Sequence, residues 1–125
     1  MFDPKLMDVG MQLAELCKTG EEAKGLETLY SQDVVSVEAL AMGEAGREAV
    51  GIEALKGKHD WWFSANVVHS SKVGGPFFFG DDKFALTFAM DATDKASGER
   101  SQMTEIGIYT VSDGKIVREE FFYGV

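Results

Sequence analysis

The sequence predicts an α+β fold in which helices cover one face of a curved sheet. Three observations support this class. Apolar residues recur at helical spacing early in the chain, they alternate at strand spacing from residue 67 onward, and Asp113-Gly114 joins two long strand patterns near the end. Helices that come first and antiparallel strands that come last are typical of α+β proteins.

Two helices are expected before residue 31. Asp3-Pro4 begins the first, because Asp is a favourable N-cap and Pro fits the first helical position, where its missing N–H is not needed. A stripe of apolar residues follows, and Gly20 ends the helix. Thr19 and Glu22 have the spacing of a capping box, which predicts a second helix that stops near residue 30.

The middle of the chain predicts a short strand, a loop and a third helix. Residues 33–39 alternate as a strand does, with Glu38 at the far end. Residues 42–51 are rich in Gly and Glu and predict a loop. From Ile52 an amphipathic helix follows, and it places His59 and Trp62 on the face expected to meet the sheet.

Four strands are predicted in the second half. The first covers residues 66–73 and is interrupted at Gly74-Gly75-Pro76 before a short aromatic run. The second covers residues 83–93, after a turn at Asp81-Asp82. The last two form a hairpin over residues 99–125, because Asp-Gly tolerates the positive φ angles of a tight turn.

Large apolar side chains gather on one face of these strands. In residues 83–93 they are Phe84, Leu86, Phe88 and Met90, and burying each would stabilise the fold by about 1.5–3 kcal/mol. On the next strand, one face carries Met103, Glu105, Gly107, Tyr109 and Val111. The opposite face is also apolar, so we expect it to be covered, and we expect a homodimer.

Length and charge exclude several classes. The 125 residues suit a single domain over residues 1–125. A net charge of −9 argues against nucleic-acid and anionic-membrane partners. The single Cys17 forms no internal disulfide, and the N-terminus has no signal-peptide pattern, so we expect a cytoplasmic protein. No apolar run approaches the roughly 20 residues of a membrane span.

Two segments resemble the nuclear-transport-factor-two-like superfamily, and within it the SnoaL-like branch. They are VSDGKIVREEFFY near the C-terminus and the helix-to-strand passage LYSQDVVSVEA. The resemblance implies a cone-shaped, cystatin-like α+β barrel, in which a bent sheet wraps a long third helix and leaves an apolar small-molecule pocket at the open end. It also implies dimers formed through the outer face of the sheet. The superfamily includes isomerases, polyketide cyclases and dehydratases, so fold alone does not settle the function.

The mechanism of ketosteroid isomerase, a member of that superfamily, does not fit this chain. That enzyme carries its aspartate base directly after a Val-Glu pair that ends the first strand, whereas Val37-Glu38 is followed here by Ala39. Its helix-one tyrosine has no counterpart between Pro4 and Lys18. Steroid isomerisation by that mechanism is therefore excluded.

Three residues are candidates for catalysis. His69 lies on a strand and titrates near neutral pH, although it could instead be a core or interface histidine. Glu105 lies mid-strand among apolar residues and could pair with His69, or form a salt bridge with Arg118 or Arg100. Tyr109 could donate to a substrate carbonyl oxygen, or belong to the core.

Other residues are candidates for contact with an apolar ligand. They are Trp62, His59, Tyr30, Glu38, Phe88 and Met90. His59 could equally be a solvated helix-end residue. No metal or cofactor is expected, because the two histidines and one cysteine lack metal-ligand spacing and no glycine-rich phosphate loop precedes a helix.

Three functions are therefore open. The first is an enzyme that performs acid–base isomerisation, cyclisation or dehydration on an apolar carbonyl compound. The second is a binding module that holds such a ligand without turnover. The third is a structural homodimer whose cavity is filled by its own side chains.

Overall fold

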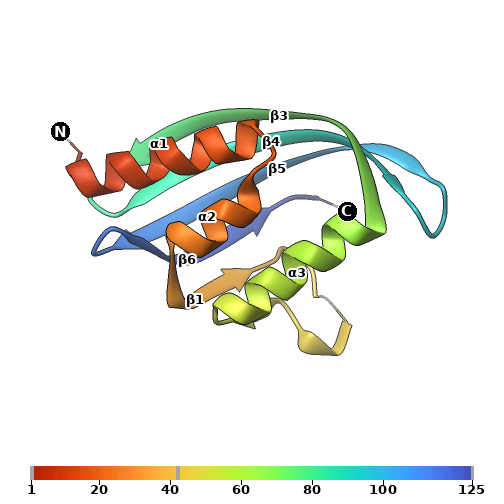
Figure 1. Cartoon of the computed structure of the whole chain (residues 1–125), viewed down its shortest axis with the longest axis horizontal. Coiled ribbons are helices and arrows are strands. Elements are labelled where there is room, and N and C mark those ends of the chain that lie inside the picture. Colours follow the sequence, from red (N-terminus) through yellow and green to blue (C-terminus); the bar gives the residue numbers. More distant parts are fainter. Residues whose placement is uncertain (1, 42, 125) are drawn as a thin grey trace.

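The computed structural model describes residues 2–41 and 43–124, in which three α-helices cover one face of a six-stranded sheet (Figure 1). The predicted α+β class is confirmed. The helices are α1 (Pro4–Lys18), α2 (Glu22–Thr28) and α3 (Ile52–Ala65). The strands are β1 (Tyr30–Val37), β2 (Glu48–Val50), β3 (Asn66–Phe79), β4 (Lys83–Asp94), β5 (Arg100–Ser112) and β6 (Lys115–Phe122).

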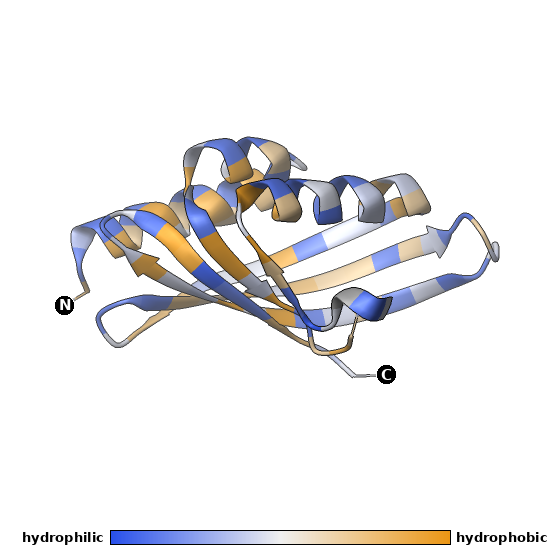
Figure 2. Ribbon diagram, turned by 90° about the horizontal axis from the view of Figure 1, so that it is seen from below, coloured by the Kyte–Doolittle hydropathy of each residue, from blue (hydrophilic) through white to orange (hydrophobic). Residues whose placement is uncertain are grey.

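The sheet is mixed and curved. Its strand order is β2-β1-β6-β5-β4-β3; β1 and β6 run parallel, and each of the other neighbouring pairs is antiparallel. Figure 2, seen from below, shows all three helices on the same side of the strands. We call the helix-covered side the inner face and the opposite side the outer face.

Of the two predicted N-terminal helix caps, that of α1 is present and that of α2 is not. Asp3 caps α1 as expected, since its Oδ1 accepts a backbone N–H at 2.7 Å. The capping box predicted for Thr19 and Glu22 is wrong. Glu21 is the N-cap of α2 and makes no side-chain cap hydrogen bond. The Thr19 hydroxyl lies instead 3.2 Å from the carbonyl of Glu15, at the end of α1.

Several strand boundaries differ from the prediction. β1 begins at Tyr30, three residues early, and the predicted loop contains a 3₁₀ turn (Gly43–Ala45) and the short strand β2. Met42, where that loop begins, lies outside the described residues, as does Val125 at the end of the hairpin. The glycines before Pro76 do not end β3, because the strand continues through a register shift between Gly74 and Phe77.

The C-terminal hairpin is confirmed. Asp113 and Gly114 have φ angles of 51° and 74°, the positive values that a two-residue primed turn requires. Because this turn sets the register, Tyr109 on β5 pairs with Glu119 on β6. The turn thereby brings two chemically important side chains onto neighbouring strands.

The core lies between the helices and the inner face. Its most buried side chains include Phe84 and Leu86 of β4, Ile116 of β6, Leu6 of α1 and Leu55 of α3. Helix α1 crosses β3 and β4 at Gly10, where an added Cβ would lie 2.7 Å from Phe78 Cε1. Glycine is therefore required at this crossing for close approach rather than for backbone conformation.

Replacing Gly10 by alanine should destabilise the protein, because the new methyl group would collide with the Phe78 ring. We expect a loss of about 1–2 kcal/mol in the free energy of unfolding. Gly57 in α3 is the matched control, since nothing lies within 4 Å of its Cβ position. Gly57→Ala should stabilise by up to about 1 kcal/mol through helix propensity. Urea denaturation of both variants measures the difference, and equal effects would contradict this packing.

Candidate functional site

The inner face of β5 carries the predicted row of side chains. Tyr109 lies opposite Phe84 of β4, and Glu105 lies opposite Phe88. Tyr109 is buried and Glu105 is partly buried. Their shared face agrees with the sequence analysis and brings a carboxyl group and a phenol to the same side of one strand.

Gly107, between them, allows the Tyr109 ring to lie along the strand. A Cβ at Gly107 would lie 2.9 Å from the Tyr109 hydroxyl oxygen and 3.1 Å from Phe121 Cε1. The ring also stacks on Phe84 at a centroid distance of 4.8 Å and an angle of 12°. The hydroxyl of Tyr109 therefore lies over Gly107, on the side of its ring toward Glu105.

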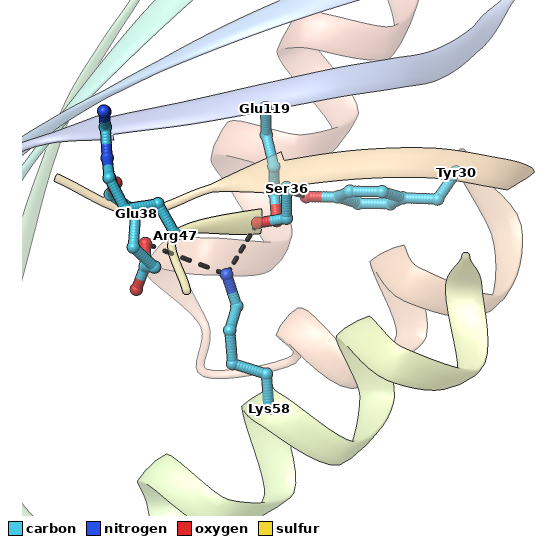
Figure 3. Close-up of polar contacts among 6 residues, drawn as sticks. All are labelled: Tyr30, Ser36, Glu38, Arg47, Lys58 and Glu119. Atoms are coloured by element: carbon cyan, nitrogen blue, oxygen red, sulfur yellow. Dashed lines mark hydrogen bonds and ion pairs between the residues drawn. The ribbon is translucent and has the colours of Figure 1, made fainter. Parts of the chain in front are cut away.

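A second carboxyl group, Glu119 of β6, is almost fully buried, with 5% of its surface exposed. Two hydroxyl groups of β1 donate to it: Tyr30 to Oε2 at 2.7 Å and Ser36 to Oε1 at 2.9 Å (Figure 3). Both donors come from the strand that runs parallel to β6. Glu119 is thus held by the pairing of these two strands.

Lys58 of α3 reaches the same group from the helix layer. Its Nζ donates to the Ser36 hydroxyl at 2.6 Å and lies 3.7 Å from Oε2 of Glu38 (Figure 3). The ammonium group also lies 5.3 Å from the centroid of the Phe121 ring. The side chains of Lys58 and Glu38 are 18% and 19% exposed, so their charges are only partly screened by water.

Burial perturbs both inner-face glutamates. Desolvation and the negative charges of Glu38 and Glu119 together raise the pKa of Glu105 to about 7, against the opposing positive charge of Lys58. Desolvation also raises the pKa of Glu119, against the hydrogen bond from Tyr30 and the charge of Lys58. Glu105 is therefore able to exchange a proton near neutral pH.

The two buried tyrosines remain hydrogen-bond donors. Desolvation and the charge of Glu119 raise the pKa of Tyr30 and of Tyr109 well above that of an ordinary tyrosine. Both hydroxyls therefore stay protonated at neutral pH. The Tyr30 hydroxyl is committed to Glu119, whereas no hydrogen bond occupies that of Tyr109 within residues 2–41 and 43–124.

The salt bridges considered for Glu105 are not formed. Arg118 pairs with Glu120 at 3.0 Å, and Arg100 pairs with Asp91 at 2.9 Å. Among the side chains that the structure describes, Glu105 has no hydrogen-bond or ion-pair partner. Its carboxyl group is thus available to a ligand on the inner face.

The structure does not bring His69 to Glu105. His69 lies at a register shift between Val68 and Ser70, and its Nε2 lies 2.7 Å from the Thr93 hydroxyl. Thr93 belongs to the outer row of β4, so His69 and Glu105 lie on opposite faces of the sheet. The bulge reverses the alternation from which a shared inner position was inferred.

His59 and Trp62 lie on α3, as predicted. Both ring nitrogens of His59 are buried without a hydrogen-bond partner among the described residues, and the Nδ1 lies 3.6 Å from the Asp60 carboxylate. Trp62 is partly buried and meets Phe63 edge-on at 5.0 Å. Their contact with a ligand stays a prediction.

The remaining predicted ligand contacts fall into two groups. Phe88 and Met90 are partly buried on the inner face, beside Glu105 and Met103. Tyr30 and Glu38 belong to the polar network of β1, where their side chains contact Glu119 and Lys58, and are not shown at the mouth of a pocket. The first group therefore lies nearer to the available carboxyl group.

The sequence analysis missed Ser36, Lys58 and Glu119. Glu119 shares its strand face with Phe121, just as Glu105 shares its face with apolar residues. This alternation was the sequence signal that could have identified Glu119 as a buried glutamate. A register shift between Thr110 and Val111 weakened it, because the alternation along the hairpin is broken there. The contacts of Ser36 and Lys58 depend on tertiary packing and leave no local pattern.

Surface hollows in the described part of the chain include one of about 320 Å³ between the start of α1 and the hairpin turn. Another, of about 580 Å³, is a groove across β3, β4, β5 and the C-terminal end of β6 that includes Glu105, Phe88 and the outward-facing Thr87. Neither is the enclosed pocket that the resemblance implies, so that pocket stays a prediction.

Neither a metal-binding cluster nor a membrane-spanning helix occurs in the described ranges. They hold no group of three or more His, Cys, Asp or Glu side chains placed to bind a metal ion. No helix in them has the length and hydrophobicity needed to cross a membrane.

Comparison with solved structures supports the fold. A proposed isomerase from Bacillus subtilis has a TM-score of 0.76 and 15% identity, covering 96% of this chain and 86% of that one. A protein with a cystatin-like fold from Xanthomonas campestris has a TM-score of 0.75 and 15% identity, with 96% and 91% covered. At such identities the similarity shows the fold alone.

A third structure is closer in sequence. A proposed SnoaL-like polyketide cyclase from Mesorhizobium loti, also labelled a carbohydrate phosphatase, shares 40% identity at a TM-score of 0.88, covering 94% of this chain and 97% of that one. A cyclase and a phosphatase catalyse different reactions, so this similarity supports the family and no single chemistry. No curated protein matches the chain. The model of the SnoaL-like domain matches residues 7–123, and the chain therefore belongs to the SnoaL-like family.

Proposed function

We propose that this SnoaL-like protein binds an apolar, carbonyl-bearing small molecule on the inner face and catalyses proton transfer on it. The observation that carries the proposal is the available Glu105 carboxyl group, which shares a strand face with the unoccupied Tyr109 hydroxyl. Phe88, Met90 and Met103 supply apolar surface beside them. A perturbed carboxyl group with a donor nearby is a typical acid–base arrangement.

The roles follow from the two protonation states. Ionised Glu105 accepts a proton from the carbon next to the substrate carbonyl, and the electron pair of the broken C–H bond moves into an enolate. The Tyr109 hydroxyl donates a hydrogen bond to the enolate oxygen. For a β,γ-unsaturated carbonyl compound this enolate is a dienolate, so protonated Glu105 returns the proton to the γ-carbon as the double bond moves next to the carbonyl, which isomerises the substrate and regenerates the carboxylate.

The base can be tested without knowledge of the natural substrate. The neutral bicyclic compound 5-nitrobenzisoxazole opens to a yellow cyanophenolate when a base removes its C–H proton. We expect the rate to rise with pH, with a midpoint at the Glu105 pKa of about 7, because only the ionised form accepts a proton. Glu105→Gln should lower the plateau rate by at least about 100-fold.

Glu99→Gln is the control, since Glu99 is an exposed glutamate just before β5. It should keep the rate and the midpoint of the unaltered protein. If Glu105→Gln opened the compound at the same rate as the unaltered protein, the catalytic proposal would be overturned. Thermal stabilisation by the bicyclic compound without such a rate would instead favour the binding module.

Ionisation of Glu105 should also affect folding. Since its pKa is raised from 4.5 to about 7 in the folded protein, the folded state binds the proton more tightly than the unfolded state. The stability from this group is complete below pH 4.5 and is lost as the pH rises through 7. Glu105→Gln should therefore be more stable than the unaltered protein at about pH 8, by about 2–3 kcal/mol.

Urea denaturation at the two pH extremes measures this effect. The difference between the two proteins should shrink toward zero at about pH 4, where the carboxyl group is protonated in both states. A difference that does not depend on pH would mean that Glu105 titrates normally.

The outer face supports the proposed homodimer. Ile106 and Phe122 form a cross-strand pair on this face and are 45% and 48% exposed, and Phe77 is 55% exposed. An apolar surface of this kind is typical of subunit interfaces. Light scattering at micromolar concentration should give twice the mass of one chain, and Ile106→Lys should reduce it to one. A monomer in both cases would contradict the proposal.

A further inference from the structure

One ammonium group acts on three carboxyl groups at the inner face. Lys58 Nζ lies 3.7 Å from Glu38 and is joined to Glu119 through the Ser36 hydroxyl. It also lies over the ring of Phe121, which pairs with Gly107, two residues from Glu105. Its positive charge opposes the raised pKa of both Glu119 and Glu105. Taken together, the three carboxyl groups and one ammonium group would carry an excess of two negative charges if all were ionised. Such a cluster favours keeping a proton on one of its acids.

The position of Lys58 is fixed from two sides. Ser36, fully buried, accepts a hydrogen bond from the ammonium group at 2.6 Å, and its hydroxyl donates a hydrogen bond to Oε1 of Glu119 at 2.9 Å. Oε2 of Glu38 is buried without a hydrogen bond in the described part of the chain, so its charge faces the ammonium group alone. The Phe121 ring, 5.3 Å away, lies beneath the ammonium group and beside Gly107 on the neighbouring strand. Lys58 is thus held over β6, the strand next to β5, which carries Glu105.

Each element around Glu105 contributes to its electrostatic environment. β4 contributes no charge there, since Phe88 faces Glu105. The titratable groups are Glu38 after β1, Lys58 on α3, Tyr109 on β5, Glu119 on β6 and Tyr123 after β6. Lys58 is the permanent positive charge of this set, and it opposes the two glutamates.

We propose that Lys58 is a positioning residue for Glu105: held by Ser36 and Glu38, its ammonium group keeps the Glu105 carboxyl ready to release its proton at neutral pH. This inference rests on the proposed acid–base function of Glu105. It assigns Lys58 no contact with the substrate. Its effect is to set how much of the base is ionised.

Lys58→Gln tests the charge, because the amide can still donate to Ser36. We expect the ionisation midpoint of Glu105 to rise by about one pH unit, since an opposite charge has been removed. The elimination rate at about pH 7 should then fall about fivefold, while the rate at high pH is retained. Lys58→Arg should restore the midpoint. Lys56→Met is the matched control, because it removes a charge paired with exposed Glu53 on the same helix.

The titration of Glu105 is read directly by ¹³C NMR of the glutamate carboxyl carbons, with Glu105→Gln identifying its signal. This measurement does not depend on activity. A midpoint that moves in Lys58→Gln while no elimination is seen would support Lys58 and overturn the catalytic function. An equal loss of rate at every pH in Lys58→Gln, with an unmoved midpoint, would overturn the inference and leave Lys58 with a structural role.

Discussion

The buried carboxyl group of Glu119 is the constraint on which the inner face depends. An ion removed from water destabilises a fold by several kcal/mol unless it is paired and hydrogen-bonded. Glu119 obtains its partners from Tyr30 and Ser36 on β1, and Ser36 in turn is fixed by Lys58 from α3. The parallel pairing of β1 with β6 and the placement of α3 over it therefore satisfy one electrostatic requirement.

That requirement separates the functions of the two inner-face glutamates. Glu119 is satisfied by two hydroxyl groups and is closed to solvent, so it organises the fold. Glu105, on the adjacent β5, shares the apolar environment but has no partner among the described residues. Two carboxyl groups in such different surroundings can serve different purposes. Lys58 links them, because its charge acts on both.

The sequence predicted what depends on neighbouring residues and failed where distant ones decide. The Asp113-Gly114 turn and the alternation of Glu105 and Tyr109 were correct, because turn geometry and strand period are local. His69 was misplaced because one extra residue in β3 reverses the period. The contact between Ser36 and Glu119 joins positions 83 residues apart, and no local pattern encodes it.

The end of β1 differs from the corresponding place in ketosteroid isomerase. In that enzyme the base follows the first strand, a position that Ala39 occupies here. In this chain the preceding residue, Glu38, faces Lys58 and is engaged in the ion pair that supports the Glu119 network. The end of β1 therefore serves the fold, and the available carboxyl group lies two strands away on β5. On the proposed function, the SnoaL-like scaffold keeps acid–base chemistry on its inner face while the strand that supplies the base changes. On that proposal, the pairing of the buried charges in this chain decides which carboxyl group stays available as the base.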